Sequence, residues 1–504
     1  MSDENTPSGP DFSAGIPAAD IAEGKMLQGH VGDEAVLIAR AGGTLFAIGA
    51  ECTHYHGPLA EGLIDGETVH CPWHHACFSL RTGQALAAPA VDPVSCWIVE
   101  EAGGRVFVKS KQGDAPAPVP RGSGQRVVIV GGGAAGYAAA ELLRREAFAG
   151  DVTVLSDDAD APYDRPNCSK DYLAGEAPQE WMPLREDSFY ADRKIDLRLN
   201  TEVAAIDAKA KTVSVRQGAS LAYDVLILAT GAEPGRPPIP GLDGPNAYTL
   251  RSLKDADAII AAAEKAKRVA VIGASFIGLE TAGALRQRGL EVNVIAPEDV
   301  PLERIVGRAL GEWVRGVHEA KGVVFHLGRK VSGYEGGHVK MDQGDPVAAD
   351  FIVVGTGVRP RVALAEAAGL KVDNGVVVDD HLRTSAEGVY AAGDVARYPD
   401  PVSGKLIRVE HWVHAERQGQ YLARLILGDD RPFGDSPFFW SSHYDKSIRH
   451  AGHAEAFDTP EVEGSIAGED AAVRFKSGGR LLAVATVGRD LENLKAQEGF
   501  DTGR

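Results

Sequence analysis

Two segments of the chain repeat one pattern, a hydrophobic strand followed by a glycine-rich turn and an alanine-rich helix. The first is RVVIVGGGAAGYAAAELLRR, from Arg126, and the second is RVAVIGASFIGLETAGALRQRG, from Arg268. A strand that enters a helix through glycines is typical of dinucleotide-binding units, because the glycines allow a tight turn and a close approach of the backbone to a pyrophosphate. The duplication therefore predicts two dinucleotide sites in an α/β body built on parallel sheets.

Length, charge and cysteine content limit the number of domains, the class of partner and the location that we expect. The chain has 504 residues and a net charge of -19, and at about 150 residues per domain it should form three or four domains. The acidic balance argues against nucleic acid or an anionic membrane as the main partner. Five cysteines are too few for a disulfide scaffold. The polar start MSDENTPSGPDFSAG is not a signal peptide, and no apolar run reaches the roughly 18 residues of a spanning helix, so we expect a cytoplasmic protein.

The region before the first repeat has a different character. Residues 24–110 contain the candidate strands AVLIAR, TLFAI, TVHCPW and RVFVK, separated by glycine-rich breaks. The segment QGDAPAPVPRGSGQ that follows has the composition of an extended linker. From about Pro432 the strand–helix alternation is lost. We therefore predict an all-β domain, a linker, the α/β body and a separate mixed α/β domain at the end.

The all-β region carries an unusual pair of ligand motifs. Cys52-Thr-His54 is followed after sixteen residues by Cys71-Pro-Trp-His74. Each motif supplies one thiolate and one imidazole, as a [2Fe-2S] cluster needs when one iron takes two cysteines and the other two histidines. Zinc accepts the same ligand types, but C-x-H paired with C-x-x-H is not usual zinc-finger spacing.

The surrounding sequence resembles the two cluster loops of Rieske proteins, over CTHYHGPLAEG and CPWHHACFSLRTG. Rieske proteins of the quinol-oxidising complexes carry an extra cysteine in each loop, and Gly57 and Trp73 stand there instead. The resemblance is therefore to the ferredoxin-type, low-potential cluster. His75 stands where the family usually has glycine, and histidine tolerates a positive φ better than most residues, so we expect the loop to keep its shape. We expect Cys77 and Cys96 to be small buried residues rather than functional ones.

The first strand–turn–helix unit contains Gly131, Gly133 and Gly136, which place a pyrophosphate at the start of a helix. Two further segments, LILATGAEP with Thr230 and Gly231 and VYAAGDVA with Gly393 and Asp394, resemble the accessory FAD motifs of the two-dinucleotide flavoprotein family. This resemblance implies that FAD binds here and that Asp394 contacts its ribityl chain.

PYDRPNCSK, from Pro162 to Lys170, resembles the loop that runs along the flavin in ferredoxin reductases and apoptosis-inducing-factor-like proteins. The resemblance implies that Arg165 meets the pyrophosphate and that Lys170 lies near the flavin ring, where a cation stabilises negative charge. The acid that usually binds the ribose is replaced by Ser156 at the strand end, so Asp157 or Asp158 is expected to serve instead.

The second unit contains Gly273, Ser275 and Gly278 and matches the nicotinamide-binding version in the same family. The resemblance implies that Phe276 covers the flavin until the nicotinamide arrives and that Glu280 contacts the carboxamide; packing within the helix is the alternative for Phe276. The next strand is followed by Glu298 rather than arginine, which favours NADH over NADPH.

Three other segments resemble parts of the same flavoproteins. VVGTGVRP, which contains Gly357, resembles the return to the flavin domain, and RVEHWVHAERQG and FFWSS resemble segments that line the flavin. The candidates for flavin contact in these segments are His411, Trp412 and Trp440, with ordinary core packing as the alternative.

Cys168 stands where the reductases usually have leucine. It is either a redox-active thiol, as in the branch of NADH oxidases and coenzyme A-disulfide reductases, or a small apolar substitution.

From about Gly24 on, the chain is similar to the Rieske-containing branch of apoptosis-inducing-factor-like flavoproteins, which have a ferredoxin reductase-type body. The resemblance implies the following division: a Rieske domain over 1–112, a linker over 113–125, an FAD domain over 126–240 and 357–430, an NAD domain over 241–356 and a C-terminal domain over 431–504.

This resemblance implies an NAD(P)H-dependent oxidoreductase that passes electrons from NADH through FAD to the cluster, and then to an external acceptor protein such as an oxygenase or cytochrome. Direct reduction of a quinone, peroxide or disulfide is one alternative. A redox-responsive interaction protein, in which NADH changes the assembly state, is another. A homodimer is left open.

Overall fold

The computed structural model describes residues 8–113, 118–122 and 124–503, which form two compact units. The first unit contains the chain up to Val119 and also the residues from Arg489 on, whereas the second spans Pro120–Gly488. The chain therefore leaves the first unit and returns to it at its C-terminal end. Within the described ranges, no helix has both the length and the apolar composition needed to cross a bilayer.

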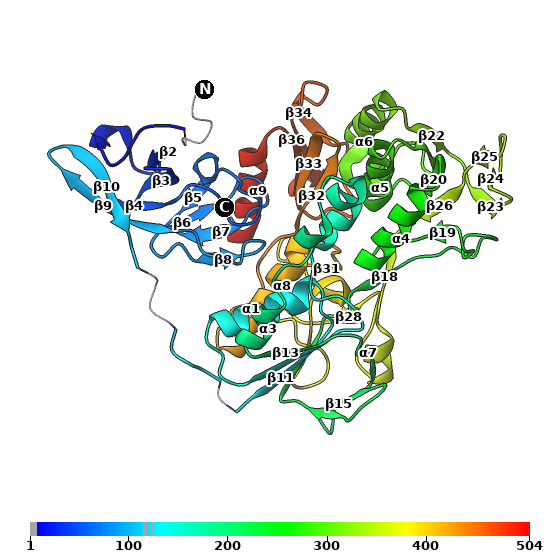
Figure 1. Ribbon diagram of the computed structural model, residues 1–504, viewed down its shortest axis with the longest axis horizontal. Helices are drawn as coiled ribbons and strands as arrows, with labels where there is room; N and C mark the ends of the chain where they lie inside the picture. The colour runs from blue at the N-terminus through cyan, green and yellow to red at the C-terminus, as the bar shows by residue number, and fades with distance from the viewer. Residues whose placement is uncertain (1–7, 114–117, 123, 504) are drawn as a thin grey trace. The chain divides into compact units, whose positions relative to one another are not determined.

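The larger sheet of the first unit is antiparallel (Figure 1). Its order is β1 (Ile16–Pro17), β10 (Arg105–Lys111), β9 (Cys96–Ala102), β4 (Thr44–Gly49), β3 (Glu34–Ala41) and β2 (Met26–Val31). Successive residues of β3 face two different cores: Leu37 and Ala39 pack with the cysteines of the ligand motifs, whereas Val36 and Ile38 pack with Trp97. This alternation follows from the period of two along a strand.

A smaller antiparallel sheet carries the ligand loops. Its order is β5 (Leu63–Asp65), β6 (Thr68–His70), β7 (Cys77–Ser79) and β8 (Ala85–Ala87). The predicted strand TVHCPW ends at His70, because Cys71 begins a turn and Pro72 has no N–H to donate to a strand partner.

Helix α9 (Asp490–Thr502) also belongs to the first unit and packs against β5. The sequence had suggested that these residues continue the C-terminal domain. They instead present the buried side chains Asn493, Leu494 and Gln497 along one helix face, as positions i, i+1 and i+4 of a helix should.

The second unit contains two parallel sheets of matching topology. The first has the order β13 (Ile195–Arg198), β12 (Asp151–Leu155), β11 (Arg126–Val130), β17 (Val225–Leu228) and β29 (Val389–Ala391). The second has the order β22 (Val324–Leu327), β21 (Glu291–Ala296), β20 (Arg268–Ile272), β26 (Phe351–Val354) and β19 (Ala247–Tyr248). The strands of the two sequence repeats, β11 and β20, occupy the same central position, which confirms the predicted duplication.

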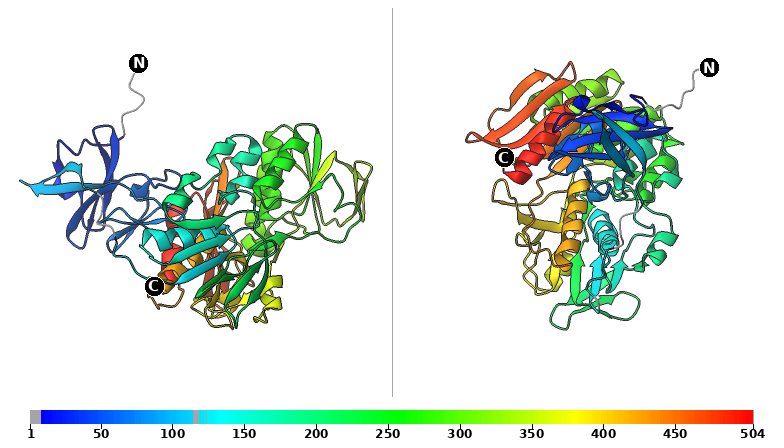
Figure 2. Two further views of the ribbon diagram at one scale, coloured as in Figure 1. Left: turned by 60° about the horizontal axis from the view of Figure 1, so that its bottom comes forward. Right: turned by 90° about the vertical axis from the view of Figure 1, so that its left-hand side faces the viewer.

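Each sheet is covered by helices. Helix α1 (Ala134–Arg145) follows β11 and packs against α8 (Trp412–Ile426), and α5 (Phe276–Gln287) follows β20. Figure 2 shows from two further sides the green helices of the second sheet, which include α4 (Leu253–Ala263) and α6 (Glu303–Ala320). The central strands are buried along nearly their whole length, as is usual for parallel strands covered on both faces.

The end of the second unit is an antiparallel sheet with the order β32 (Phe438–His443), β33 (Lys446–Gly452), β36 (Arg480–Val487), β35 (Asp470–Ser477) and β34 (Glu461–Ser465). Strand β32 contacts both α5 and α8, so this sheet closes the space between the two dinucleotide-type domains.

The remaining elements are short: β14 (Val203–Asp207), β15 (Thr212–Val215), β16 (Leu221–Ala222), β18 (Ala232–Pro234), β23 (Val331–Glu335), β24 (His338–Met341), β25 (Val347–Ala348), β27 (Val358–Pro360), β28 (Val376–Val377), β30 (Ala396–Pro399), β31 (Leu406–Ile407), α2 (Asp171–Ala174), α3 (Ser188–Asp192) and α7 (Ala363–Ala367). The expected fold class, an all-β domain followed by an α/β body and a mixed C-terminal part, is confirmed.

Candidate cluster and dinucleotide sites

The two ligand loops have the same backbone design. In the first, the Cys52 amide donates to the Gly57 carbonyl and the His56 amide to the Cys52 carbonyl. In the second, the Cys71 amide donates to the carbonyl of the residue five positions on, and the His75 amide donates to the Cys71 carbonyl. His56 and His75 occupy equivalent turn positions with φ of 57° and 61°. His75 thus adopts the positive φ that the sequence led us to expect.

The four predicted ligands come together in two pairs. The thiols of Cys52 and Cys71 are buried, and their mutual hydrogen bond together with burial raises the pKa of Cys52 well above the usual thiol range. The Nδ1 atoms of His54 and His74 lie 3.2 Å apart. A sulfur pair beside an imidazole pair is the donor set that a Rieske cluster requires.

The two loops pack closely against each other beside the predicted ligands. A Cβ on Gly57 would lie 2.7 Å from Sγ of Cys71 and 3.2 Å from the Trp73 ring. The two positions that hold extra cysteines in the quinol-oxidising proteins are therefore in contact, but they carry no thiols. No disulfide joins any cysteines among the described residues.

The surroundings of the two imidazole ligands differ. The ring of Tyr55 stacks on His54 with 4.1 Å between centroids, and Tyr55 is 40% exposed. On the other loop, His75 is completely buried and its Nδ1 is hydrogen-bonded to Oε1 of Gln497 in α9. An exposed aromatic ring thus lies on the His54 side, and a buried helix contact lies beside His74.

In the second unit, most of the predicted dinucleotide residues line one cavity of about 2700 Å³. A Cβ on Gly131, which has φ of 114°, would clash with the Ala229 carbonyl, so the turn needs glycine there. Gly136 does not line the cavity but packs against the Gly131 carbonyl, and Cys168 does not line it either. The predicted residues that line it are Gly131, Gly133, Asp157, Arg165, Lys170, Thr230, Gly231, Gly273, Ser275, Phe276, Gly278, Glu280, Glu298, Gly357, Gly393, Asp394, His411, Trp412 and Trp440.

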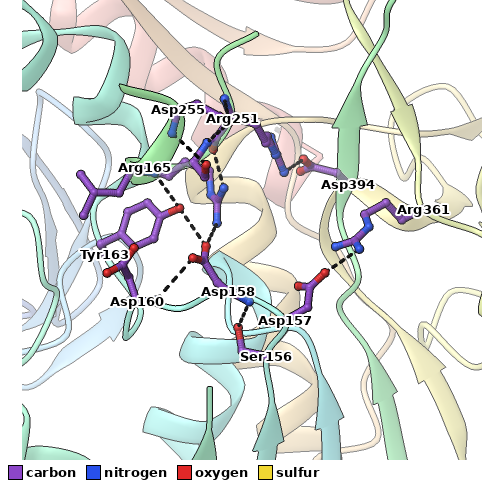
Figure 3. Close-up of polar contacts among 12 residues, drawn as sticks. Ser156, Asp157, Asp158, Asp160, Tyr163, Arg165, Arg251, Asp255, Arg361 and Asp394 are labelled. Carbon is purple, nitrogen blue, oxygen red and sulfur yellow. Dashed lines mark hydrogen bonds and ion pairs between the residues drawn. The ribbon is translucent and has the colours of Figure 1, made fainter. Parts of the chain in front are cut away.

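The two acids after Ser156 have different partners (Figure 3). Asp158 accepts a hydrogen bond from Tyr163 at 3.0 Å and lies 3.8 Å from the Arg165 guanidinium. Asp157 forms an ion pair with Arg361 at 2.6 Å. Burial alone would raise the pKa of Asp157, but the Arg361 hydrogen bond keeps it below the usual value. Asp158 therefore anchors the Arg165 loop, whereas Asp157 is an ionised group at the cavity wall.

Asp394 forms an ion pair with Arg251 at 2.7 Å, also drawn in Figure 3. The amide of Gly393 donates to Oε1 of Gln418 in α8 at 2.7 Å, which fixes the turn before Asp394. Sequence reasoning missed Arg251 and Arg361, because neither lies in a recognised motif and their partners are 143 and 204 residues away.

Lys170 and Glu280, assigned to the flavin ring and the carboxamide, form an ion pair at 2.8 Å. The Glu280 side chain is 3% exposed and also accepts hydrogen bonds from the hydroxyls of Ser169 at 2.6 Å and Ser441 at 2.7 Å. Both serines were missed. The carboxylate is thus held by donors from η3 (Arg165–Ser169), from Lys170 beside it and from β32.

Aromatic rings line the cavity near this ion pair. Phe276 meets Phe439 edge-on at 4.9 Å between centroids, and Phe439 stacks on His411 at 4.3 Å. Trp440 lies 5.9 Å from the Lys170 ammonium. Burial lowers the pKa of His411 to about 3, so its ring is neutral at ordinary pH.

Cys168 lies in a buried cluster with Tyr163, Tyr172 and Met182. Burial raises the pKa of its thiol to about 12, and the nearby Lys170 is paired with Glu280. This setting does not support an activated thiolate.

Comparison with known proteins finds two families in the chain. The pyridine nucleotide-disulphide oxidoreductase model matches residues 125–419, and the Rieske [2Fe-2S] domain model matches residues 14–98. "Apoptosis-inducing factor 3" from Homo sapiens is 30% identical over 96% of this chain and 83% of its own length. The ferredoxin–NAD(+) reductase component of an anthranilate 1,2-dioxygenase system from Burkholderia cepacia is 38% identical over 72% of this chain and 91% of its own. The crystal structure of a covalent putidaredoxin reductase–putidaredoxin complex matches with a TM-score of 0.72 and 32% identity, over 75% of this chain and 94% of the other.

Proposed function

Because the chain belongs to the pyridine nucleotide-disulphide oxidoreductase family and carries a Rieske [2Fe-2S] domain, we propose that it passes electrons from NADH through FAD to its own cluster and then to an external acceptor protein. The protein is an NAD(P)H-dependent oxidoreductase with FAD, NADH and a [2Fe-2S] cluster as its cofactors.

The observation that carries the proposal is the presence of both redox sites in one chain. The Burkholderia cepacia relative, named as the reductase component of a dioxygenase system, is covered over 91% of its length by 72% of this chain. The additional Rieske domain supports the idea that a one-electron carrier, separate in such systems, is here fused to its reductase. An oxygenase or cytochrome would be a suitable acceptor.

The first sheet supplies the FAD site. Gly131 makes the tight turn before Gly133, the N-cap of α1, and the N–H groups of that helix terminus favour a pyrophosphate. Arg165, positioned by Asp158, adds a cation for the same anion, and Asp394 offers a carboxylate for hydroxyl groups. When bound, FAD supplies a carrier of two electrons and the cluster a carrier of one.

The second sheet supplies the NADH site. Ser275 caps α5 by accepting from the Gly278 amide at 3.2 Å, and its hydroxyl donates to the Gly355 carbonyl at 2.8 Å. This holds the turn open for a second pyrophosphate. Glu298 follows β21, where a carboxylate binds the ribose hydroxyls of NADH and repels the additional phosphate of NADPH. We therefore assign NADH as the preferred donor.

An anaerobic titration of the loaded protein with NADH tests the proposal. The flavin and Rieske absorption bands should both bleach, and a cluster-free Cys52→Ala variant should show the flavin change alone. If the flavin bleaches while the wild-type cluster stays oxidised, the proposed route is wrong. In that case, direct reduction of a small molecule or an NADH-dependent change in assembly becomes the better account.

A further inference from the structure

The Lys170–Glu280 ion pair forms a wall between two cavities. Both residues line the dinucleotide cavity, and both also line a second cavity of about 630 Å³. No other described residue lines both. The second cavity, hereafter the outer cavity, is also bounded by Ser442 and Tyr444 of the C-terminal sheet and by Lys321 after α6.

The outer cavity is polar. Its wall carries the charged side chains of Asp171, Glu176, Arg286, Lys321 and Asp445. Charged groups of both signs keep such a space hydrated, because their burial without water would be costly. The cavity thus brings a hydrated, charged surface up to the Glu280 carboxylate, whose side chain is itself almost fully buried.

The other side of Glu280 is closed by a directed chain of hydrogen bonds. The Ser441 hydroxyl donates to Oε1 of Glu280, so at 3.3 Å it must accept from Nε2 of His443. Nδ1 of His443 then carries no proton and accepts from Nε2 of His318 at 3.1 Å. Burial lowers the pKa of both histidines to about 3, which is consistent with two neutral rings.

The direction of this chain decides what it can do. Every donor in it points towards Glu280, so the chain stabilises an ionised carboxylate and turns no acceptor atom towards that carboxylate. Ser441, His443 and His318 are therefore positioning residues. The other two donors to Glu280, Lys170 and Ser169, both line the outer cavity, so this is the side on which the carboxylate meets hydrated, charged groups.

The proposed function creates a need for such an outlet. NADH delivers two electrons with one hydrogen nucleus as hydride, whereas an iron–sulfur cluster accepts only electrons. One proton must therefore leave the buried site for each NADH oxidised. We propose that the Lys170–Glu280 pair is the gate through which this proton passes from the dinucleotide cavity into the outer cavity.

In this step the Glu280 carboxylate would take up the proton that a bound flavin gives up on reoxidation, and an O–H bond would form on its side chain. The O–H bond then breaks as the proton passes to water in the outer cavity, and Glu280 pairs again with Lys170. The two electrons leave separately through the cluster. The inference rests on the proposed function for the origin of the proton, and it adds the route by which the proton leaves.

The test uses the loaded protein, reduced anaerobically with NADH and then mixed rapidly with ferricyanide in weak buffer containing a pH indicator. Ser442→Phe should obstruct the outer cavity, since Ser442 lines that cavity alone. We expect proton release to slow at least about tenfold, while bleaching of the flavin by NADH is unchanged. Ser477→Phe, at an exposed position on the same sheet, is the matched control and should release protons at the wild-type rate.

A second variant tests the gate itself. In Glu280→Gln, proton release should fall at least about tenfold relative to the bleaching rate of the same variant, and formate, a small proton carrier, should restore it. Proton release that is unaffected by Ser442→Phe, or a Glu280→Gln variant in which both rates fall equally without rescue by formate, would overturn the proposal. Ferricyanide can oxidise the flavin directly, so a cluster that stays oxidised would refute the proposed function without affecting this measurement.

Discussion

Nδ1 of His75, in the second ligand loop, is hydrogen-bonded to Oε1 of Gln497, which lies 422 residues further along the chain. His75 follows the ligand His74 directly and holds the loop turn at φ of 61°. The contact therefore links the C-terminal helix to the turn that follows His74, a predicted cluster ligand. Contacts of this kind beyond the ligands themselves orient metal ligands and limit cluster loss.

Replacing Gln497 with leucine should remove this contact at nearly constant volume. We expect the Rieske absorption to be lost about tenfold faster in the presence of a chelator, with a change in the electron paramagnetic resonance spectrum of the reduced cluster. Lys495→Leu, at an exposed position on the same helix, is the control. Equal rates of loss in the two variants would show that α9 does not support the loop.

Gly57 should tolerate no side chain. A Cβ there would lie 2.7 Å from Sγ of Cys71, so Gly57→Ala should displace the ligand and reduce the iron content of the purified protein by at least about half. Gly113→Ala, whose Cβ would meet nothing within 4 Å, should leave the iron content unchanged. A fully loaded Gly57→Ala variant would mean that the loop can move without losing the cluster.

The parts of the two sites that were predictable from the sequence are those built from local motifs. The cluster motifs and the glycine turns depend on residues close in sequence, so spacing and the text of the two loops were enough to predict Cys52, His54, Cys71 and His74 as ligands. The turn of His75 was predictable for the same reason. The position of each glycine turn at the carboxyl end of its own strand also followed from the duplicated strand–helix units.

Partners from distant segments were not predictable. Ser441 and Glu280 are 161 residues apart, and Arg251 and Asp394 are 143 apart. Their pairing depends on how β32 and the two parallel sheets close on one another, which no local pattern encodes. The placement of α9 in the first unit was missed for the same reason, because its helical pattern does not state which surface it covers.

The ion pair between Arg251 and Asp394 forms where these distant segments meet, and flavin binding tests its role. Arg251→Met would leave the buried Asp394 carboxylate without its cation, a costly change. We expect FAD affinity to fall about tenfold, measured from the flavin fluorescence that appears on dilution. Arg236→Met is the control, since Arg236 does not line the cavity and bonds instead to the Leu242 carbonyl and the Thr249 hydroxyl. Tighter FAD binding in Arg251→Met would indicate instead that the ion pair competes with the flavin.

Glu298 should set the preference for NADH. It is exposed at the cavity wall just after β21, and Glu298→Arg would replace repulsion of the NADPH phosphate by attraction. The ratio of kcat/KM for NADPH to that for NADH should rise about tenfold or more. Glu291→Arg, exposed at the other end of the same strand, should leave the ratio unchanged. A constant ratio in both variants would assign the selectivity to other residues.

Cys168 should behave as a protonated, inert thiol. Its folded-state pKa of about 12 lies above the ordinary value of 9.0, so between these values the unfolded chain loses a proton that the folded chain retains. Because only the thiolate is alkylated, iodoacetamide at pH 9 should label Cys168 at least about a hundredfold more slowly in the folded protein than in urea. Cys96, which is partly exposed, provides the internal comparison, and peptide mass spectrometry reads both sites. Rapid labelling of Cys168 in the folded protein at pH 8 would instead support a redox-active thiol and direct reduction of a small molecule.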